Sequence, residues 1–137
     1  MKILNIRLMG LVTVVVVLGL SCSESVVTDI DGNSYRAVKI GDQWWMAENL
    51  RVTRYRNGDA IPNITDNKAW SQLTTGALCN YDNDPEKAAI YGLLYTWYAV
   101  IDSRGIAPEG WHVPSDEEWK QLEISLGMSE SEANKRA

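Results

Sequence analysis

The sequence contains no phenylalanine, only one histidine and two cysteines, and fewer basic than acidic side chains. Thirteen lysines and arginines against 18 aspartates and glutamates give a net charge of −5. We expect no nucleic-acid partner, because binding phosphates requires a concentrated basic face. Charged residues make up 23% and hydrophobic residues 45% of the chain, which is typical of a globular protein and not of a disordered one.

The aromatic residues are six tryptophans and six tyrosines. Both side chains join a large apolar body to a polar group, which suits half-buried and interface positions. The length of 137 residues is enough for one domain and too short for two ordinary ones.

The N-terminus has the pattern of a sorting signal. Residues 1–7 carry Lys2 and Arg7 and no acid, and residues 8–20 carry no charge. A positive segment followed by an apolar one of this length indicates a signal peptide. The apolar segment is short for a bilayer span, which needs about 20 residues, so a membrane-spanning anchor is the minor alternative.

The segment at residues 19–22, GLSC, resembles the lipobox of bacterial lipoproteins, in which cleavage before a cysteine exposes it for lipid attachment. The resemblance implies a signal peptide over residues 1–21, lipidation of Cys22, and attachment to the membrane through that lipid. Residues 22–27 then form a short tether. Removal of the two basic residues of the signal leaves 11 basic and 18 acidic side chains, a net charge of −7. An ordinary secretory signal that contains a cysteine is the alternative.

Cys79 is then the single cysteine of the folded part. Exported proteins usually pair their cysteines. An odd cysteine indicates a free thiol, an intermolecular bond, or a partner that lies outside this chain.

The first half of the mature chain has the pattern of short strands. Residues 28–45 predict a β-hairpin, because the Asp-Gly-Asn sequence at 31–33 is turn chemistry and alternating apolar residues follow it. A second turn at 41–42 leads into a strand over residues 43–50. Loops rich in glycine, proline and polar residues are predicted at 51–75 and 102–110.

Residues 76–81 predict a further short strand, and residues 90–101 predict a buried helix. The second segment is apolar almost all round, and its tyrosines and Leu94 recur at helical spacing. Together these patterns indicate an α+β fold of short antiparallel strands with two or three helices.

The stretch at residues 111–119, WHVPSDEEW, contains the only histidine beside a serine and three acids. Ser115 and Glu118 have the spacing of a capping box, in which each side chain bonds the other residue's amide. Asp116 lies in the first turn, where negative charge suits the helix dipole. We therefore predict a helix that begins after Ser115 and ends at Gly127.

His112, Ser115 and Asp116 also suggest a hydrolase. A serine whose hydroxyl caps a helix is not free to act as a nucleophile, and a triad also needs an oxyanion hole. His112 precedes Ser115 by three residues on an extended turn, which is poor geometry for proton transfer. We therefore predict no catalytic residue here and a structural role for His112.

Three segments together resemble the Fibrobacter succinogenes major paralogous domain, called FISUMP. They are DIDGNSYRAVKIGDQWWMAENLR (29–51), YGLLYTWYAV (91–100) and PEGWHVPSDEEWKQLEISLG (108–127). The resemblance runs from about Val27 to the last residue. It implies a module of exported, lipid-anchored proteins of the bacterial cell envelope, at the outer membrane or the cell surface.

The W-H-V-P-S-x-x-E-W element is also similar to an element of formylglycine-generating-enzyme-like domains, which implies a C-type-lectin-like architecture by analogy. The family's domain continues beyond this chain, so the resemblance implies a truncated domain over residues 28–137, incomplete at its C-terminus. The absent closing strand is where the resemblance places a partner for Cys79. The formylglycine-generating enzymes depend on C-terminal cysteines for copper chemistry. Because these are lacking, we expect neither that oxidase activity nor a cofactor.

Two oxygen-rich segments have spacings that partly match metal sites. Residues 29–33 have the alternating oxygens of a calcium loop, but an EF-hand loop places glycine at position 6 and glutamate at position 12, so a turn is favoured. Residues 82–84 form a second oxygen cluster without the wider ligand set of calcium. No metal site is therefore predicted.

Trp44 and Trp45 are neighbours on a predicted strand, so their rings should point to opposite faces. The resemblance places Trp45 in the core. Trp44 is then the outward ring and a candidate for binding glycan by stacking on a sugar. An edge residue covered by a loop is the alternative interpretation of Trp44.

These observations predict an exported, lipid-anchored envelope protein that acts as a non-catalytic binding or structural module. A polysaccharide and an envelope protein are the candidate partners. An enzyme of the formylglycine-generating-like or hydrolase class is one alternative, and a domain fragment without function is another. A binding module should present a shallow aromatic surface, whereas an enzyme needs a concave pocket with a perturbed acid, base or metal.

Overall fold

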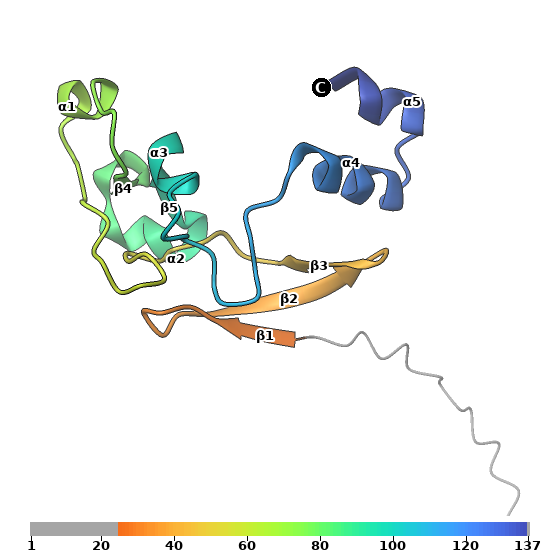
Figure 1. Ribbon diagram of the computed structural model, residues 1–137, viewed down its shortest axis with the longest axis horizontal. Helices are drawn as coiled ribbons and strands as arrows, with labels where there is room; N and C mark the ends of the chain where they lie inside the picture. The colour runs from red at the N-terminus through yellow and green to blue at the C-terminus, as the bar shows by residue number, and fades with distance from the viewer. Residues whose placement is uncertain (1–24, 137) are drawn as a thin grey trace, which may run out of the picture.

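The computed structural model describes residues 25–136 and shows an α+β fold (Figure 1). The predicted mixture of short antiparallel strands and helices is confirmed. The strands are β1 (Ser25–Thr28), β2 (Ser34–Ile40), β3 (Gln43–Met46), β4 (Leu78–Asn80) and β5 (Leu93–Tyr95). The helices are α1 (Asn67–Ser71), α2 (Ala88–Tyr91), α3 (Trp97–Val100), α4 (Asp116–Ser125) and α5 (Glu130–Ala133), with 3-10 turns at Tyr81–Asn83, Pro85–Lys87 and Asn134–Arg136.

The first three strands form an antiparallel sheet in the order β1-β2-β3. The predicted hairpin is therefore part of a larger sheet, and the predicted tether is too long. Residues 25–27 of the predicted tether pair with β2 as part of β1. Val27 lies opposite Tyr35 and is only 8% exposed, so burial of an apolar side chain explains why the strand begins this early.

The turn between β1 and β2 is held by the buried carboxylate of Asp29. Its Oδ1 atom accepts hydrogen bonds from the amides of Asp31 (3.0 Å) and Asn33 (2.9 Å). Its Oδ2 atom accepts from the Asn33 side chain (2.9 Å) and the Tyr35 hydroxyl (2.6 Å). The carboxylate is occupied by the protein's own donors, which supports the turn interpretation over a calcium loop.

The main hydrophobic core lies around the β4–β5 pair, in which Leu78 is opposite Tyr95. The Tyr95 hydroxyl donates to the carbonyl of Val52 at 2.8 Å and so attaches the long loop after β3 to this pair. Gly76 is required here, because a Cβ at this position would overlap the Tyr55 hydroxyl. The buried core residues are Val52, Tyr55, Ile61, Leu78, Ala99 and Ile106.

The predicted helix over residues 90–101 is wrong, since the segment is divided into the end of α2, then β5, then α3. Gly92 ends α2 at φ 70° and ψ −159°, a conformation essentially restricted to glycine. A Cβ at Gly92 would also overlap the Leu50 carbonyl. Thr96 then begins α3, its hydroxyl accepting from the Ala99 amide. The segment is also far from fully buried, with exposed fractions of 72% for Ile90, 67% for Trp97 and 55% for Ile101.

Residues 115–136, here called the arm, contain α4 and α5. Figure 1 shows the arm over the β2–β3 end of the sheet, apart from α1, α2 and α3. The helix α4 has no buried residue, whereas Ala133 in α5 is fully buried. Among residues 25–136, no helix is long and apolar enough to cross a bilayer.

We expect Asp29→Ala to lower the free energy of unfolding by about 2–4 kcal/mol, because the turn amides and the Tyr35 hydroxyl lose their acceptor. Asp42→Ala, in the exposed turn between β2 and β3, is the matched control and should change it by less than about 0.5 kcal/mol. Urea unfolding followed by tryptophan fluorescence measures both. Equal effects of the two substitutions would contradict the role of Asp29.

Candidate functional site

A groove of 910 Å³ runs between β3, β5 and the beginning of the arm. This volume is at the upper end of the range for small-ligand sites. Its apolar wall includes Trp45 and Met46 from β3, Leu93 and Tyr95 from β5, Ile106, Pro108 and Trp111 from the following loop, and Trp119 from α4. Its polar margin includes Gln43, Glu48, Asn49, His112 and Glu118.

Two tryptophans that are far apart in the sequence meet beside the groove. The ring centroids of Trp45 and Trp119 are 4.9 Å apart and their planes are tilted by 47°, which is a favourable arrangement for an aromatic pair. Trp119 is still 50% exposed, so much of its indole surface is open to a ligand. The indole nitrogen of Trp45 is buried and has no hydrogen-bond partner.

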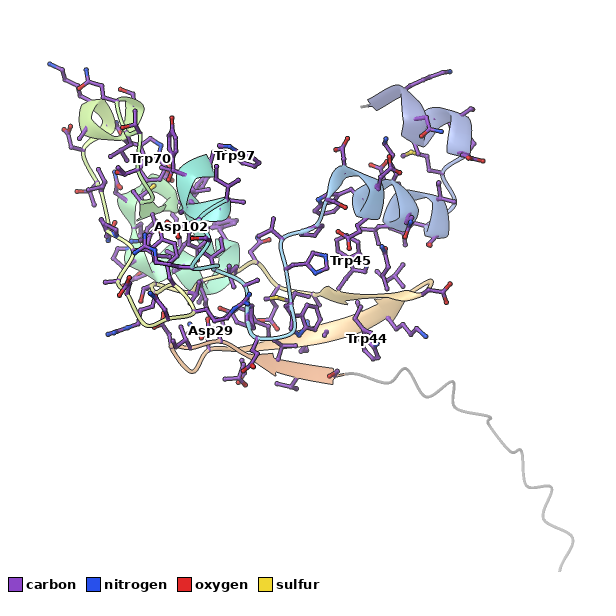
Figure 2. All side chains as sticks on the ribbon, in the orientation of Figure 1. Asp29, Trp44, Trp45, Trp70, Trp97 and Asp102 are labelled. Atoms are coloured by element: carbon purple, nitrogen blue, oxygen red, sulfur yellow. The ribbon has the colours of Figure 1, made fainter. Side chains whose placement is uncertain are left out.

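Trp44 and Trp45 point to opposite sides of the sheet, as predicted for neighbours on a strand. Trp44 pairs with Lys39 of β2, whereas Trp45 pairs with Val38. Figure 2 shows Trp45 on the side that faces α4 and Trp44 on the other side. Trp44 is 41% exposed, and its role in ligand binding stays a prediction.

Ser115 and Glu118 form the predicted capping box at the start of α4. The Ser115 amide donates to Glu118 Oε2 at 2.8 Å, and the Glu118 amide donates to the Ser115 hydroxyl at 3.4 Å. The Ser115 hydroxyl also donates to Glu118 Oε2 at 2.9 Å, and His112 Nε2 lies 2.7 Å from Glu118 Oε1. These hydrogen bonds, those from Ser115 first, lower the pKa of Glu118 to about 2.

This cluster does not have the geometry of a hydrolase triad. The Ser115 hydroxyl donates to a carboxylate and not to His112, which contacts the other carboxylate oxygen. Asp116 lies in the first turn of α4, where the helix dipole favours its charge. A carboxylate with a pKa of about 2 is a weak base at neutral pH. The Ser115 and Glu118 side chains therefore serve to begin α4.

The sequence reasoning missed Leu93, Tyr95 and Trp111 as groove residues. Leu93 and Tyr95 were assigned to a buried helix, and the isolated Gly92 before them was the signal for a chain reversal. Trp111 belongs to a loop whose path is set by distant contacts, such as the bond from the Arg56 guanidinium to the carbonyl of Ala107 at 3.2 Å. No local pattern predicts such a contact.

Among residues 25–136, no group of three or more histidine, cysteine, aspartate or glutamate side chains is placed to hold a metal ion. In the oxygen cluster at 82–84, the Lys87 ammonium pairs with Asp82, and the Asp84 carboxylate accepts from the Glu86 amide. The carboxylates are thus engaged by groups of the protein itself.

Of the two cysteines, only Cys79 lies within the residues that the structure describes. Cys79 in β4 is free and half-buried, and burial raises the pKa of its thiol. The partner that the resemblance implies for it stays a prediction. Cys22, the predicted lipidation site, lies outside the described residues, so its lipidation also stays a prediction.

The fold and the groove define a small α+β module with a tryptophan-lined groove beside a capped helix. The family described as the Fibrobacter succinogenes major domain matches residues 38–137, a span that begins within β2 and includes the arm. The chain therefore belongs to this family, as the resemblance implied. Neither a comparison with curated proteins nor one with solved structures found a match.

The lowered pKa of Glu118 predicts an acid-sensitive start of α4. Because the pKa is depressed on folding, the ionised carboxylate stabilises the helix fully above its unfolded value of about 4.5, and this stabilisation is lost as the pH falls through about 2. We expect the helical circular dichroism signal to decrease over this window. Glu118→Gln keeps a capping side chain that does not ionise there, so it should remove this step. An unchanged profile in the variant would contradict the assignment.

Proposed function

We propose that the protein is exported, anchored by lipid in the bacterial cell envelope at the outer membrane or the cell surface, and serves as a non-catalytic binding module for glycan. The single observation that carries the binding proposal is the groove, where half of the Trp119 surface is exposed beside the packed ring of Trp45. An indole face stacks on the C–H face of a sugar ring, while polar side chains at the margin can bond hydroxyl groups.

A non-catalytic role is supported by the hydrogen bonds within the cluster of His112, Ser115 and Glu118. Glu118 and Ser115 bond each other's backbone amides, so their main interactions begin α4. His112 has a side chain that is 69% exposed and lies at the margin of the groove. Binding through apolar and aromatic groups needs none of these side chains to exchange a proton.

The finer fold assignment, a C-type-lectin-like and formylglycine-generating-enzyme-like architecture, is part of the same proposal. Its support is the W-H-V-P-S-x-x-E-W element, which here forms the entry to α4 and its capping box. The small antiparallel sheets combined with short helices are compatible with it.

An envelope protein is the second candidate partner. It is favoured by large apolar side chains that the fold leaves exposed on α2, β5 and α3, because contiguous exposed apolar surface marks interaction sites. The most exposed are Ile90 (72%), Trp97 (67%), Ile101 (55%), Tyr91 (51%) and Leu94 (49%).

We expect the full chain in detergent to bind at least one member of an array of bacterial and plant cell-wall polysaccharides. For that polysaccharide, Trp119→Ala should weaken the affinity measured by calorimetry about tenfold or more, because truncation removes the exposed ring of the groove. Trp97→Ala, which removes an exposed indole that does not line the groove, is the matched control and should change the affinity less than about twofold.

Trp44→Ala in the same assay decides whether the outward ring of β3 takes part. A loss of affinity adds Trp44 to the site, and undiminished binding removes it. Equal losses in the Trp119→Ala and Trp97→Ala variants would contradict binding in the groove. Absence of binding by every polysaccharide would leave the envelope protein as the partner to test.

We expect Cys22→Ser to release the protein from the membrane fraction, because lipid on this thiol is the proposed attachment. Cell fractionation followed by immunoblotting measures the distribution. Cys79→Ser is the matched control and should leave the protein in the membrane fraction. Continued membrane association of the Cys22→Ser variant would indicate an uncleaved N-terminal helix instead.

A further inference from the structure

The groove is lined by few side chains that can carry a charge. Apart from its tyrosines, the titratable side chains among its described lining residues are those of Glu48, His112 and Glu118. None of these lining residues is a lysine or an arginine. Proteins bind carboxylate, sulfate and phosphate groups mainly through the forked donors of arginine or the ammonium of lysine. The groove therefore presents neither of these groups to an acidic sugar.

Three arginines contact groove residues without lining the groove themselves, and each is engaged by the protein. The guanidinium groups of Arg36 and Arg51 lie 3.6 and 3.4 Å from the Glu48 carboxylate. The Arg51 guanidinium also donates to a backbone carbonyl of β2 at 2.9 Å. The Arg56 guanidinium donates to two backbone carbonyls of the loop before the arm. These cations are therefore occupied by acceptors that belong to the protein.

The two carboxylates of the groove are engaged in the same way. Glu48 Oε1 accepts from the Arg36 amide at 3.0 Å, and Oε2 accepts from the Arg51 guanidinium at 3.4 Å. Glu118 accepts from the amide and the hydroxyl of Ser115 and contacts the histidine. These donors lower the pKa of both carboxyls, the Arg36 amide foremost for Glu48 and the Ser115 amide foremost for Glu118. Neither carboxylate is left to pair with the ammonium of an amino sugar.

Uncharged hydrogen-bonding groups complete the margin of the groove. The Gln43 amide nitrogen donates to the Gln121 side-chain oxygen at 2.9 Å, and the Asn49 amide nitrogen donates to the Tyr91 carbonyl at 3.1 Å. Both bonds lie in exposed positions. Because a side-chain amide has two N–H donors and an oxygen with two lone pairs, each amide can make further bonds. Such groups suit sugar hydroxyl and acetamido groups, which are uncharged donors and acceptors.

From these observations we propose that the groove is selective for uncharged glycans and excludes both acidic and basic sugars. This inference rests on the proposed function, whose class of ligand it narrows. The ligand lies against the exposed part of Trp119 and the apolar wall, and its hydroxyl or acetamido groups bond the amides of Gln43 and Asn49.

The selectivity follows from the cost of removing a charge from water. A carboxylate or an ammonium group would lose hydration beside the apolar wall without gaining an unengaged partner of opposite charge, which is unfavourable. A hydroxyl group pays a smaller cost and is compensated by a hydrogen bond. The net charge of −5 also repels polyanions at a distance, but salt screens this effect.

The selectivity is tested with the full chain in detergent on an array that carries each polysaccharide in three forms. These are the native polymer, the polymer with its primary hydroxyl groups oxidised to carboxylates, and the oxidised polymer after methyl esterification. We expect a neutral polymer to bind, oxidation to weaken its affinity about tenfold or more, and esterification, which removes the charge, to restore it. For N-acetylated polymers, deacetylation should weaken the affinity similarly.

The weakening should persist at a salt concentration of about 1 M, where the Debye length of about 3 Å screens the net charge of the protein. An oxidised or deacetylated polymer that binds as tightly as its native form would overturn the selectivity. A loss that esterification does not reverse would also overturn it, because shape and not charge would then be the cause.

A variant that places a cation at the margin provides the second test. Gln43→Arg should strengthen binding of the oxidised polymer about fivefold or more, because its carboxylates gain a charged donor. Gln72→Arg is the matched control, since Gln72 is exposed after α1 and does not line the groove. It adds the same charge and should change the affinity less than about twofold. Equal gains in the two variants, or none in either, would overturn the groove as the source of the selectivity.

The outcomes separate this inference from the proposed function. If no form of any polysaccharide binds, the glycan proposal fails and the selectivity fails with it. If polygalacturonate or a glucosamine polymer binds more tightly than every neutral polymer, the glycan function stands and the selectivity alone is overturned.

Discussion

The indoles of Trp45 and Trp119 join β3 to α4, and with them two parts of the chain that make few other contacts. Residues of β3 and β5 supply one wall of the groove, and Trp119 of α4 lines it beside Trp45. An aromatic pair contributes about 0.5–1.5 kcal/mol beyond its buried area. The exposed bond between Gln43 and Gln121 adds about 1 kcal/mol at most. The start of the arm, which carries Trp119, is therefore part of the candidate site.

The parts of the fold that follow from local chemistry were predictable from the sequence. The Asp-Gly-Asn turn, the capping box at Ser115 and the opposite orientations of Trp44 and Trp45 each depend on residues within a few positions of one another. The parts that depend on distant contacts were not. The segment after Gly92 is a strand because Leu93 bonds the Leu50 carbonyl and pairs with β4, and nothing within the segment itself signals those partners.

The difference between local and distant contacts also explains how much of the candidate site was predictable from the sequence. The sequence drew attention to His112, Ser115 and Asp116, whose proximity is local. Ser115 caps α4 and Asp116 lies in its first turn, while His112 contacts the Glu118 carboxylate. The groove was not predictable, because its wall combines two strands, a loop and a helix that meet only after folding. Glu118 shows why a shifted pKa alone does not identify catalysis. Its pKa is lowered chiefly by bonds from Ser115 at the start of a helix, which is a structural cause.

The early start of β1 has a consequence for the proposed anchor. Because β1 begins at Ser25, only two residues separate the strand from Cys22, and an extended chain advances at most about 3.6 Å per residue. A lipid on Cys22 would therefore hold the beginning of β1 within about 11 Å of the membrane surface. Ser25 itself lines the groove. If Cys22 carries the proposed lipid, a glycan in contact with Ser25 would have to reach within the same short distance of the membrane surface.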